Sequence, residues 1–158
     1  MRSLAQWLEL YGVSHQHTVN KSIHHVCVPA IQFSLLGLLW LVRLPFAESL
    51  PHPLANLATI IVLLLLPWYF VLSWRIAIGM MLLSFSMLVV IHVLYSTGLL
   101  LELSVGVFAI AWAGQFVGHH IEGRKPSFFD DLRFLLIGPL WVISYFYELM
   151  GIPVEAKQ

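Results

Sequence analysis

The fold is decided by residues 49–101, which read SLPHPLANLATIIVLLLLPWYFVLSWRIAIGMMLLSFSMLVVIHVLYSTGLLL and contain one formal charge, Arg75. As a single helix this stretch would be roughly 80 Å long, whereas the hydrocarbon core of a bilayer is about 30 Å thick. It must therefore fold back on itself, and the only polar break near its middle is Ser73-Trp74-Arg75. The sequence predicts two membrane-spanning helices, over residues 54–72 and 76–95, joined by a tight turn.

The composition of the whole chain agrees with a membrane protein. Of 158 residues, 59% are hydrophobic and 10% are charged, whereas a soluble domain is about 25% charged. A soluble chain of this length could not bury so much apolar surface in one core. Eight basic residues balance eight acidic ones, so no net charge attracts nucleic acid. The single cysteine, Cys27, excludes a disulfide framework and a cysteine-rich zinc site.

Three further apolar runs complete the predicted fold, over residues 26–42, 103–118 and 132–150. We therefore expect an all-α integral membrane bundle that forms a single domain over residues 1–158. It has about five transmembrane helices, or four if one of the weaker runs does not span. The weakest is 103–118, which is short and contains Gln115.

The N-terminal residues predict a short helix that lies in the membrane interface. Leu4, Trp7, Leu8 and Tyr11 follow the spacing i, i+3, i+4 and i+7, which puts them on one face of a helix. An amphipathic helix with Trp and Tyr on its apolar face is typical of a membrane-surface segment.

Five spans would place the basic residues unequally on the two sides of the membrane. The side that holds the N-terminus and the turn at residues 73–75 has six of them, and the other side, which would hold the C-terminus, has two. The six are Arg2, Lys21, Arg75, Arg124, Lys125 and Arg133, and the two are Arg43 and Lys157. The positive-inside rule makes the first side cytoplasmic. Six of the eight histidines fall on that side, in two groups far apart in sequence.

The second of these groups is typical of a metal site. Residues 115–126 read QFVGHHIEGRKP, and on a helix Gln115, His119 and Glu122 share one face. A histidine and a carboxylate one turn apart can supply two ligands to a divalent metal. A further histidine would complete the two-His-one-carboxylate set of non-haem Fe(II) oxygenases. Histidine also binds zinc, so these ligand types do not choose the metal.

The first group offers the missing ligand. Residues 11–25 read YGVSHQHTVNKSIHH. A continuous helix would align His17, Asn20 and His24 on one stripe, whereas a helix that starts near Thr18 or Asn20 would allow His15 to loop back to the same site. Spacing does not decide between His15 and His17. Asn20, one turn before His24, is expected to hold a ring nitrogen of a ligand.

At these residues the chain resembles the Mpo1-like family. The matching segments are residues 11–29 and residues 115–126, and the stretch 128–141 is also similar to bacterial members. The resemblance implies a membrane Fe(II)-dependent dioxygenase that uses O2 to convert a 2-hydroxy fatty acid to the acid one carbon shorter and CO2. The metal ligands and catalytic residues it implies are His15, His24, His119 and Glu122.

The resemblance favours His15 over His17, and His17 and His120 remain further candidate ligands. Tyr11, Asn20 and Gln115 are expected beside the ligands. Lys125 and Arg124, next to Glu122 in the sequence, are candidates for binding the substrate carboxylate. The expected partner is a membrane lipid or a long-chain 2-hydroxy fatty acid, in a bacterial inner membrane or the endoplasmic reticulum, with the metal site on the cytoplasmic side.

Two other functions fit the same residues. A zinc-dependent membrane lipid hydrolase would use Glu122 as a general base instead of a ligand. A non-enzymatic lipid-binding or assembly protein would have histidines that merely lie at the membrane interface. The sequence does not indicate the substrate chain length or the oligomeric state.

Overall fold

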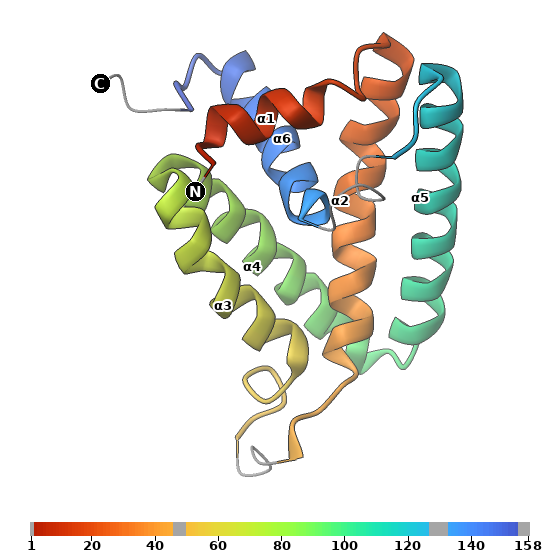
Figure 1. The fold of residues 1–158 in the computed structure, drawn as a ribbon. Coiled ribbons are helices and arrows are strands. Elements are labelled where there is room, and N and C mark those ends of the chain that lie inside the picture. The colour runs from red at the N-terminus through yellow and green to blue at the C-terminus, as the bar shows by residue number, and fades with distance from the viewer. Residues whose placement is uncertain (1, 46–49, 127–132, 155–158) are drawn as a thin grey trace.

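The computed structural model describes residues 2–45, 50–126 and 133–154, and within these ranges it is all-helical, as predicted. Six helices follow one another along the chain (Figure 1). They are α1 (Leu4–Gly12), α2 (Thr18–Trp40), α3 (Leu57–Leu72), α4 (Trp74–Ser96), α5 (Leu100–Glu122) and α6 (Phe134–Leu149). Among the described residues, α2, α4 and α5 are long and apolar enough to cross a membrane, while α3 and α6 are shorter apolar helices.

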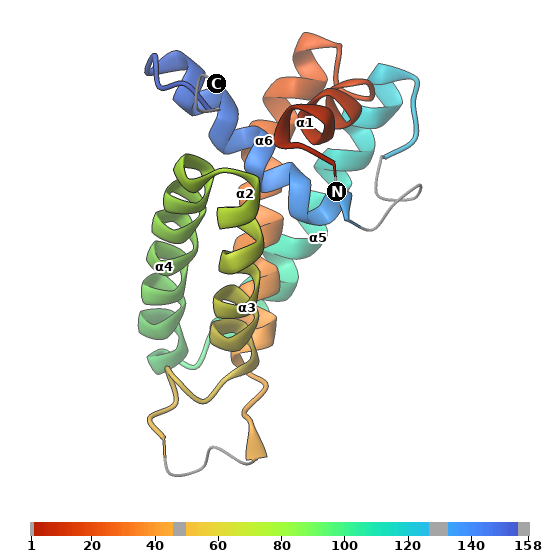
Figure 2. The ribbon, with the colours of Figure 1, turned by 60° about the vertical axis from the view of Figure 1, so that its left-hand side comes forward.

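Helices α2 to α5 form two antiparallel pairs. α2 and α5 lie side by side along their whole length, and α3 and α4 form a hairpin next to them (Figures 1 and 2). Ser73 alone separates α3 from α4 and is extended, with φ −167° and ψ 127°. The tight turn predicted at this position is therefore confirmed.

Small residues allow α2 and α5 to approach closely. A Cβ atom added to Gly114 would lie 2.7 Å from the Cys27 Sγ atom, and one added to Gly37 would collide with the Ser104 hydroxyl. Close contact at glycine, serine and alanine is the usual way in which membrane helices pack. This helix pair contains His24 on α2 and His119 on α5.

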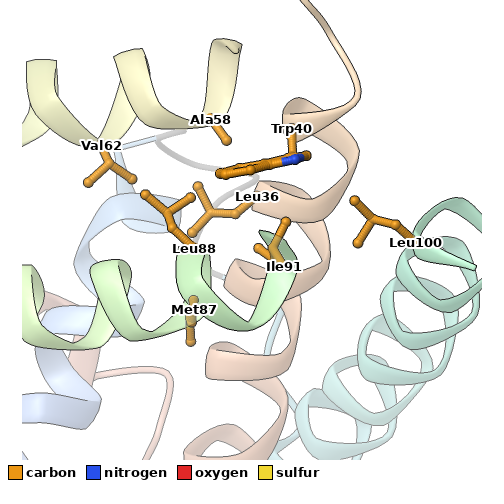
Figure 3. Packing of buried hydrophobic residues seen from close by; sticks show 8 residues of the cluster. All are labelled: Leu36, Trp40, Ala58, Val62, Met87, Leu88, Ile91 and Leu100. Atoms are coloured by element: carbon orange, nitrogen blue, oxygen red, sulfur yellow. The ribbon is translucent and has the colours of Figure 1, made fainter. Parts of the chain in front are cut away.

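A hydrophobic core joins α2, α3, α4 and α5 at the end of the bundle away from the histidine groups (Figure 3). Its largest member is Trp40, which is 1% exposed. The other buried members are Leu36, Ala58, Val62, Met87, Leu88, Ile91 and Leu100. Burial of this many apolar side chains fixes the spacing of the four helices.

Two helices are longer than the apolar runs that predicted them. α2 begins at Thr18 rather than residue 26, and α5 extends over 23 residues to Glu122 rather than ending at 118. The added turns contain polar residues such as Asn20 and His119, which are buried. Hydropathy predicts helices that are too short at these ends, because the polar side chains there face the protein interior and lower the local hydropathy.

The prediction for the C-terminal side is wrong. The Ser73 hydroxyl donates a hydrogen bond to the Val154 carbonyl oxygen at 2.8 Å, so the chain after α6 lies at the α3–α4 turn. The first residue of α6, Phe134, contacts the Trp7 ring of α1 at 5.7 Å. α6 therefore runs from beneath α1 back to the end of the bundle that holds the α3–α4 turn (Figure 2). Part of its apolar surface is buried against protein, including Ile137, Leu140 and Val142.

The partner of the N-terminal helix also differs from the prediction. The short helix is present as α1, and a capping box between Ser3 and Gln6 fixes its start. However, its apolar residues Leu4, Trp7 and Tyr11 are buried against α3, α4 and α6. The amphipathic pattern was interpreted correctly as a helix, but its apolar face packs on protein rather than on the membrane interface.

Candidate metal centre

Three histidines from three segments converge at one end of the bundle. His15 lies in the loop between α1 and α2, His24 lies on α2 and His119 lies on α5. They are 1%, 0% and 4% exposed. One ring nitrogen of each lies within 4.8 Å of those of the other two, and the Nε2 atoms of His24 and His119 are 3.1 Å apart. Such a group can hold a metal ion.

Backbone hydrogen bonds fix the orientation of two of the rings. The Nδ1–H group of His15 donates to the Tyr11 carbonyl oxygen at 2.6 Å, and that of His24 donates to the Asn20 carbonyl oxygen at 3.0 Å. In both rings the Nε2 atom is then the one with a free lone pair. This arrangement, with Nδ1 held by a backbone carbonyl, is the usual one for histidine ligands of metals.

The buried polar atoms of the site fit a metal ion. The Nε2 atom of His15 is buried without a hydrogen-bond partner among the described residues, although such a group normally needs one. Two nitrogens bonded to one ion at about 2.1 Å lie roughly 3 Å apart when their bonds are near perpendicular, which agrees with the 3.1 Å between His24 and His119. Three imidazole nitrogens suit Fe(II) and Zn(II) alike.

The environment of His15 keeps its ring neutral. Burial lowers the pKa of His15 to about 4, because a charged imidazolium loses its hydration in the interior. The Tyr11 ring stacks on the His15 ring at 4.2 Å and 12°, and burial raises the pKa of the Tyr11 phenol. At neutral pH both groups are uncharged, and His15 is available as a ligand.

Glu122 does not belong to the three-histidine group. Its Oε1 atom accepts a hydrogen bond from the Gln16 N–H at 2.8 Å. Its Oε2 atom accepts from the His17 N–H at 2.8 Å and from Asn20 Nδ2 at 3.0 Å. The predicted face shared with His119 exists, but the carboxylate at the end of α5 turns to the start of α2. The structure thus leaves Glu122 outside the three-histidine group, and its role as a ligand, expected from the sequence, stays a prediction.

The remaining predicted residues fall into two classes. Asn20 and Gln115 are buried near the ligands, and Asn20 holds His24 through its carbonyl oxygen, while its side chain contacts Glu122. His17 is exposed and caps α2 by accepting the Val19 N–H, and His120 is exposed on α5. Of the two histidines between which the sequence left the choice open, only His15 lies in the buried group, so the geometry favours His15 and its role as a ligand stays a prediction.

An apolar cavity of about 420 Å³ extends from the histidines into the bundle. His15, His119, Tyr11 and Gln115 line its polar end. Its wall is otherwise almost entirely apolar and includes Val28, Leu36, Ile61, Val62, Leu65 and Trp112. A cavity of this size with a few polar groups at one end is typical of a site for an apolar ligand.

Sequence reasoning missed the contribution of α6 to the site. The Trp141 ring lies 5.5 Å from the His15 ring and 5.6 Å from the Tyr11 ring, and it stacks on the His25 ring at 5.0 Å. It thus packs against the His15 side of the site. Its position at the end of the stretch that resembles bacterial relatives was the only signal that could have found it.

Comparisons with known proteins agree with this geometry. A family model described as 2-hydroxy-palmitic acid dioxygenase Mpo1-like matches residues 1–150. The chain is 30% identical over 156 residues to 2-hydroxy-palmitic acid dioxygenase MPO1 of Saccharomyces cerevisiae, which covers 98% of this chain and 85% of that relative. No solved structure matches the chain. The family match includes all three segments that supply the clustered histidines, and the chain therefore belongs to the Mpo1-like family.

Proposed function

We propose that this protein is a membrane Fe(II)-dependent dioxygenase that carries out α-oxidation of 2-hydroxy fatty acids. The observation that carries the proposal is the convergence of three buried histidines at the end of an apolar cavity. Membership of a family described by 2-hydroxy-palmitic acid dioxygenase activity supports the same chemistry. A fatty acid has a polar head and an apolar tail, and the cavity lining likewise combines polar residues near the histidines with apolar residues.

The proposed reaction balances without an external reductant. A 2-hydroxy acid and O2 give the acid one carbon shorter, CO2 and water. Oxidation of the hydroxyl-bearing carbon with loss of CO2 releases four electrons, which is the number needed to reduce O2. When bound, Fe(II) supplies the oxygen chemistry that side chains lack and offers coordination positions to the hydroxyl and carboxylate oxygens of the substrate.

In this proposal His15, His24 and His119 are the ligands. Their burial excludes water, and the backbone hydrogen bonds of His15 and His24 hold two of the Nε2 atoms toward the centre of the group. Three ligands from one side leave the cavity side for the substrate. Tyr11 and Trp141 keep the His15 ring in place by stacking and edge contacts.

The substrate tail is proposed to lie in the apolar cavity. The cavity runs from His15 and His119 to Leu36 and Val62, deep in the bundle. An alkyl chain gains about 0.8 kcal/mol for each CH₂ group that leaves water, so a long tail would add greatly to binding. This favours long-chain acids over short 2-hydroxy acids.

Lys125 and Arg124 are proposed to bind the substrate carboxylate as it enters. Both are exposed and directly precede Pro126, which is buried and lines the cavity. Alanine at both positions should raise KM for the acid and leave the metal content unchanged. An unchanged KM in the double variant would exclude this role.

The site is proposed to face the cytoplasm. The basic residues counted on that side of the membrane lie at the histidine end among the described residues, and Arg43 lies at the other end; Lys157 is outside the described residues. Since the chain after α6 lies at the α3–α4 turn, the arrangement favours four crossing helices, α2 to α5.

The test is anaerobic purification in detergent followed by metal analysis of the wild type and a His119→Ala variant. We expect about one iron per chain in the wild type, as a single mononuclear site requires, and its loss in the variant. Oxygen consumption with 2-hydroxypalmitate should follow the iron content. Zinc in place of iron would favour a zinc-dependent lipid hydrolase, and no metal would favour a lipid-binding protein.

A further inference from the structure

We propose that Glu122 is a positioning residue that holds the loop around His15 against α2 and α5, and so delivers the third histidine to the site. The inference deepens the proposed function and rests on it for the identity of the metal. It assigns Glu122 no bond to the metal. Its action is on the backbone of the segment that contains His15.

The three histidines differ in how they are supported. His24 and His119 lie on α2 and α5, which are packed along their length. His15 lies in the short loop after α1, where the Ser14 N–H donates to the Tyr11 carbonyl oxygen at 3.3 Å and the His15 N–H donates to the Gly12 carbonyl oxygen at 3.0 Å. Two ligands are therefore set by helix packing, while the third depends on whatever holds the loop.

Glu122 is the residue that ties this loop to α5. Its two oxygens accept three hydrogen bonds, from the N–H groups of Gln16 and His17 and from Asn20 Nδ2. Asn20 Nδ2 also donates to the Ser14 carbonyl oxygen at 3.2 Å. The carboxylate and the amide thus contact the chain on both sides of His15. Hydrogen bonds to a charged acceptor are about twice as strong as neutral ones.

The position of the Glu122 carboxylate at the end of α5 indicates that it stabilises another segment rather than α5 itself. Glu122 is the last residue of α5, where a negative charge is unfavourable because the carbonyl ends of the helix point there. The N–H groups it accepts precede the first turn of α2, where helix N–H groups lack intrahelical partners and the dipole is positive. The carboxylate at the end of α5 therefore lies near the positive end of α2 and binds the N–H groups of the loop just before it.

A close approach of the two helices makes this contact possible. A Cβ atom added to Gly118 would collide with the side-chain oxygen of Asn20, so glycine one turn before Glu122 leaves room for the amide. Asn20 is fully buried there. The arrangement requires an acceptor with two oxygens at 122 and a donor amide at 20.

The test is Glu122→Gln, with Glu102→Gln as the matched control on the exposed far end of α5. Glutamine keeps one acceptor oxygen and replaces the other with an NH₂ group, which cannot accept a hydrogen bond from the N–H group of Gln16 or His17. In metal-free protein, amide hydrogen exchange at Gln16 and His17 should be at least about 10-fold faster in Glu122→Gln, since these hydrogen bonds are what protects them. Unchanged exchange at these amides would overturn the proposal.

The second readout is the coordination of Co(II), bound in place of the native metal. The exchangeable Nδ1–H protons of coordinated histidines give shifted NMR signals. We expect Glu122→Gln to lose the His15 signal and keep that of His24, with metal affinity lower by about 10- to 100-fold. If Glu122 were itself a ligand, both histidine signals would persist while the visible spectrum changed, and the positioning role would be wrong.

The two readouts separate this inference from the proposed function. A wild type that binds no metal would contradict the dioxygenase proposal, yet faster exchange at Gln16 and His17 in the metal-free variant would still support the hold on the loop. Conversely, iron-dependent activity with normal exchange in Glu122→Gln would support the dioxygenase and overturn the positioning role. Glu102→Gln should leave exchange and coordination unchanged.

Discussion

The two ends of the helical bundle both contain histidines packed on aromatic rings, but they are built differently. At the site end, His15, His24 and His119 direct ring nitrogens toward one another in a buried group. At the far end, His52 stacks on Tyr95 at 4.5 Å and contacts the Trp40 ring at 5.6 Å. There the rings meet through their faces, in the manner of packing residues.

The difference shows which property marks a candidate ligand. A lowered pKa does not, because burial lowers the pKa of His52 as it does that of His15. A buried nitrogen without a partner does not either, since His52 Nδ1 is also one. Among the residues that the structure describes, only the site end brings nitrogens from three separate segments within reach of a single ion. Convergence is therefore the criterion that separates the two ends.

The largest expected effect follows from that criterion. His24→Ala should abolish metal binding, because the ring nitrogens of His15 and His119 alone would rarely hold an ion against a chelator. His92→Ala, at the exposed far end of α4, should leave the metal content unchanged. Metal analysis of both purified variants makes the comparison. Retention of full metal in His24→Ala would contradict the three-histidine centre.

The far end should instead control stability. Trp40→Ala should lower the free energy of unfolding by about 3–5 kcal/mol, the usual cost of removing a buried Trp side chain, because Trp40 fills the core between α2 and α3 (Figure 3). Trp74→Ala, at a position that is 53% exposed, should cost far less. Unfolding in detergent measures both, and equal losses would contradict the role of Trp40. The folded fraction of Trp40→Ala should bind metal normally.

The site was only partly predictable from sequence, for reasons that are local. His24 and His119 could be found because helical spacing and topology bring them to one end. The choice of His15 over His17 depends on where α2 begins, and the hydropathy pattern begins eight residues after Thr18. Glu122 shares a helix face with His119, but spacing cannot show that its oxygens accept the N–H groups of Gln16 and His17 in the loop before α2.

The fold was predictable as far as apolar patterns determine it. All-helical architecture and the turn at Ser73 followed from the length of the uncharged stretch. The places of α1 and α6 did not, because an apolar face has the same pattern whether lipid or protein covers it. In this structure Trp7 and Phe134 cover one another, and no periodicity distinguishes that contact from a membrane.

Glycines along the α2–α5 pair offer a matched comparison of the two ends. Gly118→Ala, at the site, and Gly37→Ala, near the far end, each place a methyl group against a neighbouring side chain. Each should destabilise the protein by about 1–3 kcal/mol, as overpacking does. Gly106→Ala, with no atom within 4 Å of the added Cβ, is the control.

Only Gly118→Ala should also weaken metal binding, because it displaces Asn20 and the loop that Asn20 holds. Thermal unfolding and chelator competition on the three variants separate the two effects. If Gly37→Ala weakened metal binding as much as Gly118→Ala, the site would depend on the whole helix pair rather than on this local contact.

The smallest expected effect tests whether a residue of the far-end core limits the length of substrate tail that the cavity accepts. Val62 belongs to the far-end core and also lines the cavity that begins at His119. Val62→Phe should shorten the space for the substrate tail, so turnover of the longest acids should fall by about 10-fold, equivalent to 1.4 kcal/mol, which is within the usual cost of overpacking. Shorter acids should be oxidised as by the wild type, since the histidines are unchanged.

Leu64→Phe provides the control, because Leu64 lies on the same helix but is 71% exposed and outside the cavity lining. Competition between acids of different chain length, measured for both variants, gives the ratio of turnover of long acids to turnover of short acids. An unchanged preference in Val62→Phe with normal metal content would mean that the tail leaves the bundle before it reaches α3. A shifted preference would mean that the far-end core, which binds no metal, sets how much of the tail the site end can accept.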